Sequence, residues 1–270
     1  MTLFSIPQVT NRRIVKFVEA LWRFIFYSLF CVVGYYALFV PETVIWMKDT
    51  AHYFLDWPSH ELLPAVDFYY QIELGCYIHQ LLWTEVSRSD AVEMIVHHIV
   101  TILLIVFSYH TNFTRFGATI LFLHDISDVF LEFAKVLNYT SKGRGNRWIK
   151  QYSVVDALFV LFAVTFLVTR LYMYPKYILW TVVVHGIDKY GCDFLGCYVF
   201  IGLLTALQLL HIFWFYLIMR MVIKLMSTGI QEDERSDAED EDISNEFNEG
   251  EFERTASLKD DDDKKKKKDK

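Results

Sequence analysis

Apolar stretches of about 20 residues recur along the first 230 residues of the chain, separated by short polar segments. A helix of this length crosses the roughly 30 Å hydrocarbon core of a bilayer. In lipid, a helix also lets one segment satisfy all of its own backbone hydrogen bonds. The pattern predicts an all-α polytopic membrane protein with about six transmembrane helices. We expect them at residues 17–40, 64–83, 91–110, 116–137, 152–174 and 198–223.

Two parts of this pattern are ambiguous. The span 64–83 can lie in a membrane only if its polar residues face other helices, and these residues are Asp67, Gln71, Glu73 and His79. After the span 152–174 we expect Pro175 to end the helix, because proline lacks a backbone N–H. The apolar run 177–184 that follows is too short to cross a bilayer.

Lysine and arginine residues near the span ends indicate the orientation, because cytosolic loops are enriched in them. Ten lie on the side of the two chain termini: Arg12, Arg13, Lys16, Arg88, Lys142, Arg144, Arg147, Lys150, Arg220 and Lys224. Four lie on the other side: Lys48, Arg115, Lys176 and Lys189. We therefore expect both termini in the cytosol.

Composition supports the membrane class and separates off a tail. Hydrophobic residues make up 54% of the chain and the mean hydropathy is +0.25, which is too apolar for an ordinary cytosolic domain. Residues 231–270 hold 17 acidic and 9 basic residues, whereas the rest is close to neutral. We expect a cytosolic flank at 1–16, a membrane domain at 17–226 and a disordered acidic cytosolic tail at 227–270, with a tag-like end.

Ser236 precedes a run of acidic residues, a setting that acid-directed kinases favour. It is a candidate phosphorylation site, although a plain solubilising tail explains the same residues. Two of the four cysteines, Cys31 and Cys76, fall inside spans. Cys192 and Cys197 fall together in the last non-cytosolic loop, where an oxidising lumen would permit a disulfide or leave two thiols.

Two sequons, at Asn112 and Asn138, give no firm glycan site. The first lies almost at the membrane edge, and the second faces the cytosol in this topology. The first residues show no cleavable signal peptide, so the first span is expected to act as the insertion signal.

Ionisable residues in the third and fourth spans carry the most information, because each costs roughly 2.5 to 3.5 kcal/mol at the centre of a bilayer. Glu93, His97 and Thr101 share one stripe of the third span, with His98 turned about 100° away. In the fourth span one seam holds Asp125, Asp128, Glu132 and Lys135, with His124 a turn before Asp128. We expect the two stripes to face each other or a cavity.

A structural explanation suffices for some of these groups. Glu132 and Lys135 fit a neutralised pair. The remaining histidines lack partners at useful spacing and are expected to be structural or interfacial: His52, His60, His79, His110, His185 and His211. Four buried groups in two neighbouring spans are too costly for packing alone, and they are the candidate catalytic residues: His97, His98, Asp125 and Asp128.

Two chemistries suit adjacent histidines with two aspartates. Membrane di-iron oxygenases use histidine clusters such as H-x-x-x-H, and this chain has no such box. In acyl transfer, an aspartate polarises an imidazole that acts as a general base or as a nucleophile, and no metal is needed.

The same residues resemble a known family. The motifs are Met94-x-x-His97-His98-x-x-Thr101, then Phe107-Ser108-Tyr109-x-x-Asn112-x-x-Arg115-x-Gly117, then His124-Asp125-x-Ser127-Asp128-x-x-Leu131-Glu132-x-Ala134-Lys135. They resemble the signature of the ceramide synthases, the longevity-assurance branch of the TLC-domain family, and the animal members most of all.

The resemblance implies N-acylation of a sphingoid long-chain base by a fatty acyl-CoA in the endoplasmic reticulum, which gives ceramide or dihydroceramide. Acyl-CoA is then a co-substrate, and no cofactor, metal or nucleic acid is expected. Membrane lipids are expected contacts, and a homo- or heterodimer is compatible with the family. The family's histidine and aspartate pairs fall on His97, His98, Asp125 and Asp128. Acyl-chain preference is assigned to the loop before the last span, here from His185 through Asp188 to Leu195.

Animal members usually carry a further upstream span and a homeobox-like segment. Residues 1–16 are then expected to be the remnant of that segment.

A mechanism follows as a hypothesis. The spans enclose a tunnel, and Asp128 orients His97, which either accepts the acyl group or deprotonates the incoming amine. His124 supports the site, and Arg170 either neutralises an aspartate or extends to the interface. A basic loop is a candidate site for the CoA phosphates or simply a topology determinant: Lys142, Arg144, Arg147 and Lys150. The alternative is a non-enzymatic TLC-domain protein that binds or transfers lipid.

Overall fold

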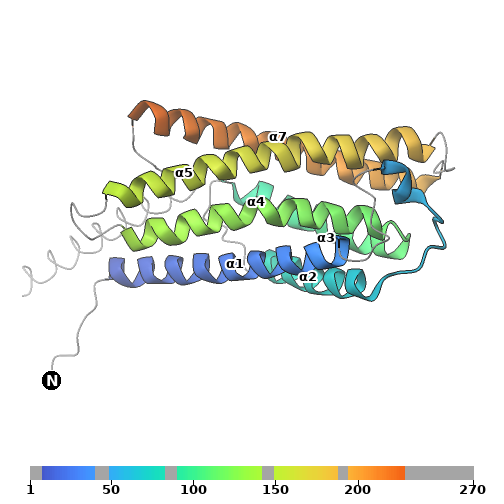
Figure 1. Ribbon diagram of the computed structural model, residues 1–270, viewed down its shortest axis with the longest axis horizontal. Coiled ribbons are helices and arrows are strands. Elements are labelled where there is room, and N and C mark those ends of the chain that lie inside the picture. The colour runs from blue at the N-terminus through green and yellow to red at the C-terminus, as the bar shows by residue number, and fades with distance from the viewer. Residues whose placement is uncertain (1–7, 40–48, 83–89, 142–148, 188–193, 229–270) are drawn as a thin grey trace, which may run out of the picture.

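A computed structural model describes residues 8–39, 49–82, 90–141, 149–187 and 194–228, with side chains over 14–39, 49–82, 90–140, 154–187 and 194–227. In the described residues every regular element is helical. The long helices lie side by side as a bundle, and α1 begins at the end of the bundle where α7 finishes (Figure 1). Their bounds are α1 Gln8–Phe39, α2 Pro64–Leu82, α3 Ala91–His110, α4 Thr114–Ser141, α5 Ile149–Phe166 and α7 Leu195–Thr228.

These bounds confirm the all-α membrane fold. The helices α2 and α3 start where the spans 64–83 and 91–110 are expected, and α4 and α7 extend a few residues beyond theirs. By length and composition, four described segments could each cross a membrane: Ile14–Phe39, Ala91–His110, Val154–Gly186 and Leu195–Ser227.

The expected helix break at Pro175 is wrong. α5 runs on without interruption into the π-helical segments η3 (Leu167–Leu179) and η4 (Thr181–Gly186), with Pro175 inside η3. The backbone N–H of Trp180 donates to the carbonyl of Pro175, five residues back. In this wider register the backbone re-pairs around the proline, as it does in other membrane helices. The fifth span is therefore longer than residues 152–174.

α4 occupies the centre of the bundle. It packs against α1, α2, α3, α5 and η3, and its residues from Phe116 to Asp125 are all buried. A helix enclosed by other helices does not present its polar side chains to lipid, so it tolerates the charged groups that disfavour a lipid-facing span. The same applies to α2 at Glu73, whose side chain is buried.

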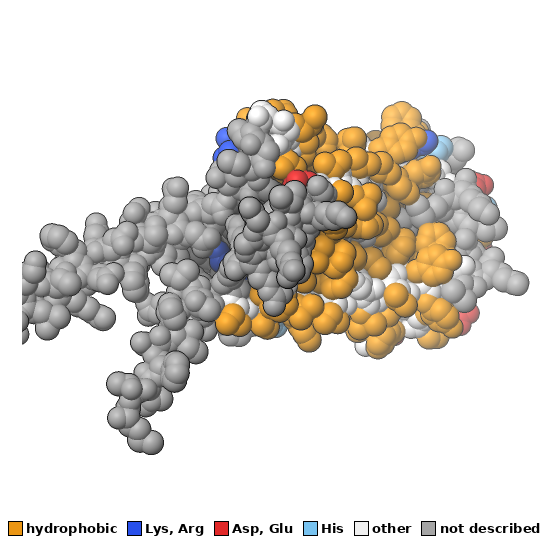
Figure 2. All heavy atoms as spheres, turned by 60° about the vertical axis from the view of Figure 1, so that its left-hand side comes forward, with side chains coloured by type: hydrophobic (Ala, Val, Ile, Leu, Met, Phe, Trp, Pro, Cys, Tyr) orange, Lys and Arg blue, Asp and Glu red, His pale blue; other side chains and the backbone are white. Residues whose placement is uncertain are grey.

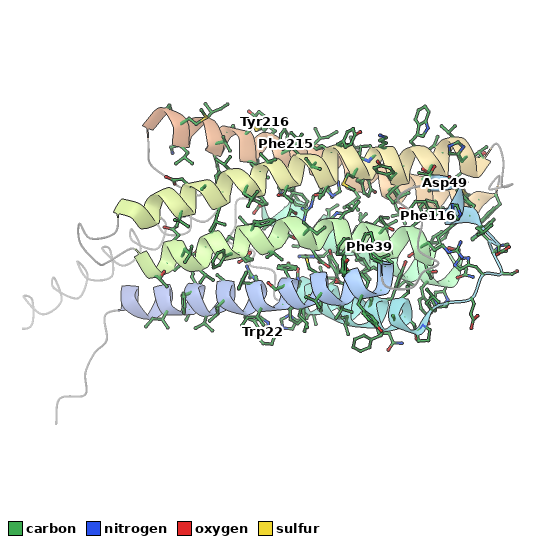
Figure 3. The ribbon with its side chains drawn as sticks, in the orientation of Figure 1. Trp22, Phe39, Asp49, Phe116, Phe215 and Tyr216 are labelled. Carbon is green, nitrogen blue, oxygen red and sulfur yellow. The ribbon has the colours of Figure 1, made fainter. Side chains whose placement is uncertain are left out.

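The outer surface of the bundle is apolar. Figure 2 shows hydrophobic side chains over most of the visible described surface. Along α1 the exposed residues include Trp22, Ile25 and Leu29, and Figure 3 shows Trp22 and Tyr216 pointing away from the bundle. An exposed apolar surface of this extent fits contact with lipid chains.

The described part of the connection between α1 and α2, residues 49–63, packs over one end of the bundle. Its short 3₁₀ helix η1 (Thr50–Phe54) buries Tyr53 and Phe54 against α4, and the Tyr53 ring stacks on Phe116 at 4.4 Å. Arg115 donates to the carbonyls of His52 and Leu55 at 2.7 and 2.8 Å. We call residues 49–63 the end cap.

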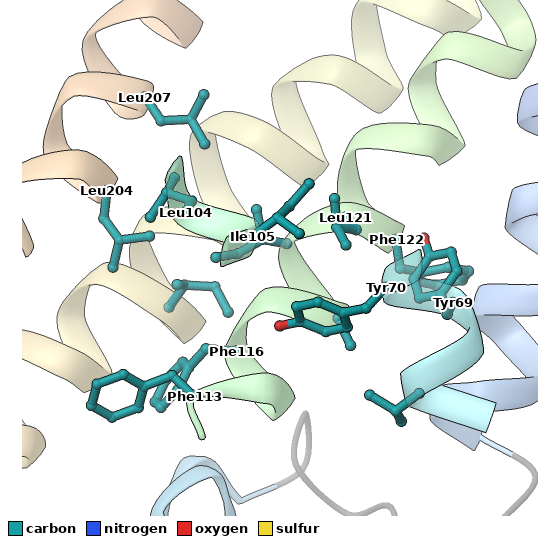
Figure 4. Close-up of a cluster of buried hydrophobic side chains, with 14 of the residues drawn as sticks. Tyr69, Tyr70, Leu104, Ile105, Phe113, Phe116, Leu121, Phe122, Leu204 and Leu207 are labelled. Carbon is teal, nitrogen blue, oxygen red and sulfur yellow. The ribbon is translucent and has the colours of Figure 1, made fainter. Parts of the chain in front are cut away.

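A core of large side chains connects the end cap to the centre of the bundle. Figure 4 shows residues of this core from α2, α3, α4, α7 and the turn before α4: Tyr69, Tyr70, Leu104, Ile105, Phe113, Phe116, Leu121, Phe122, Leu204 and Leu207. The approach of α4 to α2 is close at Gly117, where a Cβ atom would overlap the Tyr70 hydroxyl. Glycine therefore allows α4 to cross α2 here without displacing Tyr70.

Candidate functional site

The four candidate catalytic residues lie in the bundle interior on α3 and α4. His97, His98 and Asp125 are 7%, 3% and 1% exposed, and about a quarter of the Asp128 side chain is exposed. The rings of His97 and His124 are stacked with their centroids 6.2 Å apart. The third span therefore meets the fourth at His97 and His124, whereas Asp125 and Asp128 of the predicted stripe bond to α2 and η3.

Asp125 is bonded to α2. Its Oδ2 accepts a hydrogen bond of 2.7 Å from the hydroxyl of the fully buried Tyr69. The side chain of Glu73, one turn further along α2, interacts with the same carboxyl group. Tyr69 and Glu73 therefore belong to the site and fix the position of Asp125.

Asp128 is bonded to η3. Its Oδ1 accepts a hydrogen bond of 2.9 Å from Nη2 of Arg170 and one of 3.3 Å from Ser127. The same arginine donates to the carbonyl of His124 at 3.0 Å, and its guanidinium lies 4.6 Å from the centroid of the Phe166 ring. Arg170 therefore neutralises an aspartate, the first of its two predicted roles. Asp128 is held by Arg170 and Ser127, while Nδ1 of His97 has no hydrogen-bond partner.

His124 is paired with His211 of α7, and the atoms involved define the tautomers. Nδ1 of His124 lies 2.6 Å from the carbonyl of Ile120, which can only accept, so this nitrogen carries a hydrogen. In a neutral ring Nε2 of His124 is then an acceptor, and it receives the hydrogen of His211 Nε2 at 2.7 Å. Nδ1 of His211 is left as a buried acceptor without a partner.

Aromatic rings surround the adjacent histidines. Tyr77 lies edge-on to both, with centroid distances of 6.1 Å to His97 and 6.0 Å to His98. Trp214 of α7 meets His97 edge-on at 5.1 Å. These contacts hold the imidazoles in a setting of low polarity, where electrostatic interactions are strong.

Several polar atoms of this region are buried without a hydrogen-bond partner. On α3 they are His97 Nδ1, His98 Nδ1 and Thr101 Oγ1, and on α7 they are Gln208 Oε1, His211 Nδ1 and Trp214 Nε1. An unsatisfied buried polar atom costs about 1 to 3 kcal/mol. Such a concentration of unpaired atoms is typical of a surface that a ligand or water completes.

Glu132 and Lys135 form an ion pair of 2.8 Å within α4, which agrees with the predicted neutralised pair. Among the described residues, no three His, Cys, Asp or Glu side chains are placed to hold a metal ion together.

Several predicted site residues lie at the edge of the described chain or outside it. Lys142, Arg144, Arg147, Asp188, Cys192 and Ser236 lie outside the described residues. The backbone of Lys150 is in the first turn of α5, but its side chain is not described. Cys197 is buried and disulfide-bonded, whereas Cys31 and Cys76 are free.

The predicted chain-length loop is shorter than expected. His185 lies within the helical segment η4, and Leu195 begins α7. The reason is the same π-helical continuation that carries the fifth span past Pro175.

The sequence interpretation missed Tyr69, Glu73 and His211 as parts of the site. Tyr69, Glu73 and Tyr77 recur every four residues, which is one face of a helix and a usable signal. His211 was interpreted as structural because nothing near it in sequence suits a partner, yet it bonds to His124, 87 residues away.

Fold and site together define a polytopic helical membrane protein with a buried histidine and carboxylate cluster. Residues 16–220 match the TLC domain. The chain is 39% identical over 243 residues to Ceramide synthase 4 of Homo sapiens, covering 89% of this chain and 57% of that protein. It is 36% identical over 242 residues to Ceramide synthase LOH2 of Arabidopsis thaliana, covering 86% and 78%.

This protein belongs to the TLC-domain family and is related to its ceramide synthases. The chain spans little more than half the length of the animal relatives that it matches, at 57% and 56% of the human and Mus musculus forms of Ceramide synthase 4.

Proposed function

We propose that this protein is a sphingoid base N-acyltransferase that transfers a fatty acyl group from acyl-CoA to the amine of sphinganine or sphingosine. The observation that carries the proposal is the set of ionisable side chains inside the bundle, His97, His98 and Asp125 buried and Asp128 about a quarter exposed, in a chain related to ceramide synthases. Burial among apolar helices keeps water from an activated acyl group and strengthens each electrostatic interaction.

Two routes are open to His97. In the first, a ring nitrogen attacks the thioester carbonyl, the C–S bond breaks and CoA leaves as the thiolate. The amine then displaces the imidazole and loses a proton. In the second, the imidazole takes a proton from the incoming ammonium group, and the amine attacks the thioester carbonyl directly. The C–S bond then breaks, CoA leaves as the thiolate, and the nitrogen loses its extra proton to give the amide. Trapping acylated His97 with acyl-CoA alone supports the first route, and its absence in fully active protein excludes that route.

The carboxylates and the arginine act through position and charge. Arg170 holds Asp128, and Tyr69 with Glu73 holds Asp125, so neither aspartate can rotate without breaking hydrogen bonds. The carboxylates are fixed on α4, the helix whose His124 stacks on His97, and they stabilise positive charge that develops within reach of them in the site. No cofactor is proposed, and acyl-CoA is the co-substrate.

The proposed location rests on the relation to ceramide synthases, and the proposed orientation rests on charge. The proposal sets this multi-pass protein in the endoplasmic reticulum membrane, with both termini in the cytosol. At the end of the bundle where α1 begins and α7 finishes, the described basic residues include Lys16, Arg220 and Lys224. The CoA phosphates are proposed to bind the neighbouring basic loop, Lys142, Arg144, Arg147 and Lys150. The acyl chain is proposed to run through a tunnel toward the opposite end.

The test is ceramide formation by purified protein given sphinganine and a panel of acyl-CoA lengths. His97→Ala and Asp128→Asn are expected to abolish activity while the protein remains folded. His110→Ala is the matched control, because His110 is exposed at the end of α3. Inactivity of folded wild-type protein would favour a non-enzymatic lipid-binding protein instead. Stoichiometric iron in purified protein, found by elemental analysis, would favour a lipid hydroxylase.

A further inference from the structure

We propose that the seam between α3 and α7 binds the polar headgroup of the sphingoid base, an amine flanked by two hydroxyl groups. The seam consists of the side chains of Thr101, Gln208, His211 and Trp214 beside His97. The inference rests on the proposed function and names the place where its acceptor substrate binds.

Two contacts define the seam. Trp214 meets His97 edge-on at 5.1 Å. Further along, the rings of Phe107 on α3 and Phe200 on α7 stack with their centroids 5.7 Å apart. Residue numbers rise along α3 and fall along α7 between these points, so the two helices are antiparallel. The segment between the contacts holds Thr101 on α3 and His211 and Gln208 on α7.

The spacing groups the polar residues of α7. Gln208, His211 and Trp214 recur every three residues, so they lie within a sector of about 120° around α7, and Trp214 of this set contacts His97 on α3. Thr101 is one turn after His97 on α3. From Trp214 to Gln208 the helix rises by about 9 Å, at about 1.5 Å per residue. That length suits a small polar group rather than a long chain.

All of these residues carry a buried atom that lacks a hydrogen-bond partner: Thr101 Oγ1, Gln208 Oε1, His211 Nδ1, Trp214 Nε1 and His97 Nδ1. The glutamine oxygen and the His211 nitrogen are acceptors, and the tryptophan N–H is a donor. An amine with two hydroxyl groups offers several donors and two acceptors, so it can satisfy this set. The seam has no carboxylate, so it suits an amine that must become neutral before it attacks.

The surroundings fit an amphiphile. At one end of the seam lies His97, the proposed reactive group, and at the other end the apolar core of Leu104, Leu204 and Leu207. A sphingoid base with its amine near His97 would extend its hydrocarbon chain along that core. This arrangement follows the order of groups in the lipid itself.

The experiment measures KM for sphinganine and for acyl-CoA separately, in wild type and in Thr101→Val, Gln208→Met and Trp214→Phe. Each change keeps the approximate shape and removes hydrogen-bonding capacity. The expected result is a rise of about three- to tenfold in KM for sphinganine, as for the loss of one hydrogen bond, with KM for acyl-CoA unchanged. Thr205→Val is the matched control, because Thr205 is exposed on α7 and donates to the carbonyl of Ile201.

A second measurement does not depend on catalysis. Thermal unfolding is followed with sphinganine alone, with an analogue lacking the 1-hydroxyl group, and with octadecylamine. Wild type is expected to be stabilised most by sphinganine, and the Thr101→Val, Gln208→Met and Trp214→Phe proteins are expected to lose part of that preference. If sphinganine stabilises a wild-type protein that has no activity, the proposed headgroup site stands and the proposed acyltransferase function is rejected.

Two results would overturn the inference. One is that the seam variants and Thr205→Val give the same KM and the same thermal shift. The other is that KM for acyl-CoA rises instead, which would assign the seam to the thioester.

Discussion

Arg170 on η3 and Asp128 on α4 are joined by a hydrogen bond of 2.9 Å inside the bundle, although 42 residues separate them in sequence. The arginine is 6% exposed and also donates to the carbonyl of His124. This pair fastens the extended fifth span to the central helix at the level of the site.

Replacing Arg170 by methionine should leave Asp128 without its counter-charge. We expect a loss of about 3 kcal/mol, the lower end for a buried pair, because part of Asp128 remains exposed. Thermal unfolding in detergent micelles measures it. Lys176→Met on the same helix is the control, because Lys176 is exposed and contacts the neighbouring Tyr172 and Tyr177 instead of a buried carboxylate. Equal melting temperatures for the two variants would contradict a structural role for the pair.

Gly117→Ala should destabilise the protein, because the new methyl group would overlap the hydroxyl of Tyr70 and lie 2.8 Å from that of Ser108. Overpacking of this kind costs about 1 to 3 kcal/mol. Gly75→Ala is the matched change, since a Cβ atom there has no neighbour within 4 Å. It should raise stability slightly through helix propensity. If both variants unfold at the same temperature, the close crossing of α2 and α4 is not as described.

His60 in the end cap should make stability depend on pH. Burial, together with the nearby Arg115, lowers the pKa of His60 from 6.5 to about 4, while Asp56 opposes the shift. The unfolded state then binds more protons between pH 4 and 6.5, so stability is complete above this window and is lost as pH falls through it.

The check is the unfolding temperature as a function of pH for wild type and His60→Gln. The variant should show a shallower loss between pH 6.5 and 4. His110→Gln, a change at an exposed position, serves as the control. A steeper or unchanged slope in His60→Gln would contradict the assignment.

Asn112 should carry no glycan, although it lies in a sequon. Its Nδ2, the atom to which a glycan is attached, donates to the carbonyls of Pro58 and His60 at 2.7 and 2.9 Å. Both hydrogens are used to hold the end cap, and Thr114 of the sequon is buried and bonded to His60. Gel mobility should therefore be the same before and after endoglycosidase treatment. A mobility shift that Asn112→Gln removes would refute this.

The sequence alone determined the class of fold and the candidate catalytic residues. Long apolar segments predict membrane helices because lipid gives their backbones no other partner. His97, His98, Asp125 and Asp128 stand out because ionisable groups are rare at such depth. These arguments use local composition and spacing, and both can be read along the chain. The match of α3 with the expected 91–110 shows how well they work for an uninterrupted apolar segment.

Only the tertiary structure decided which residues of the site interact with one another. Glu73 and His211 join Asp125 and His124 across helices, and no local pattern indicates which faces will meet. The same limit explains the wrong prediction that the helix ends at Pro175. There a wider helical register and neighbouring helices override the preference of proline to end a helix. Hydrogen bonding between distant segments depends on how helices pack, because each buried polar group must find a partner wherever the bundle places one.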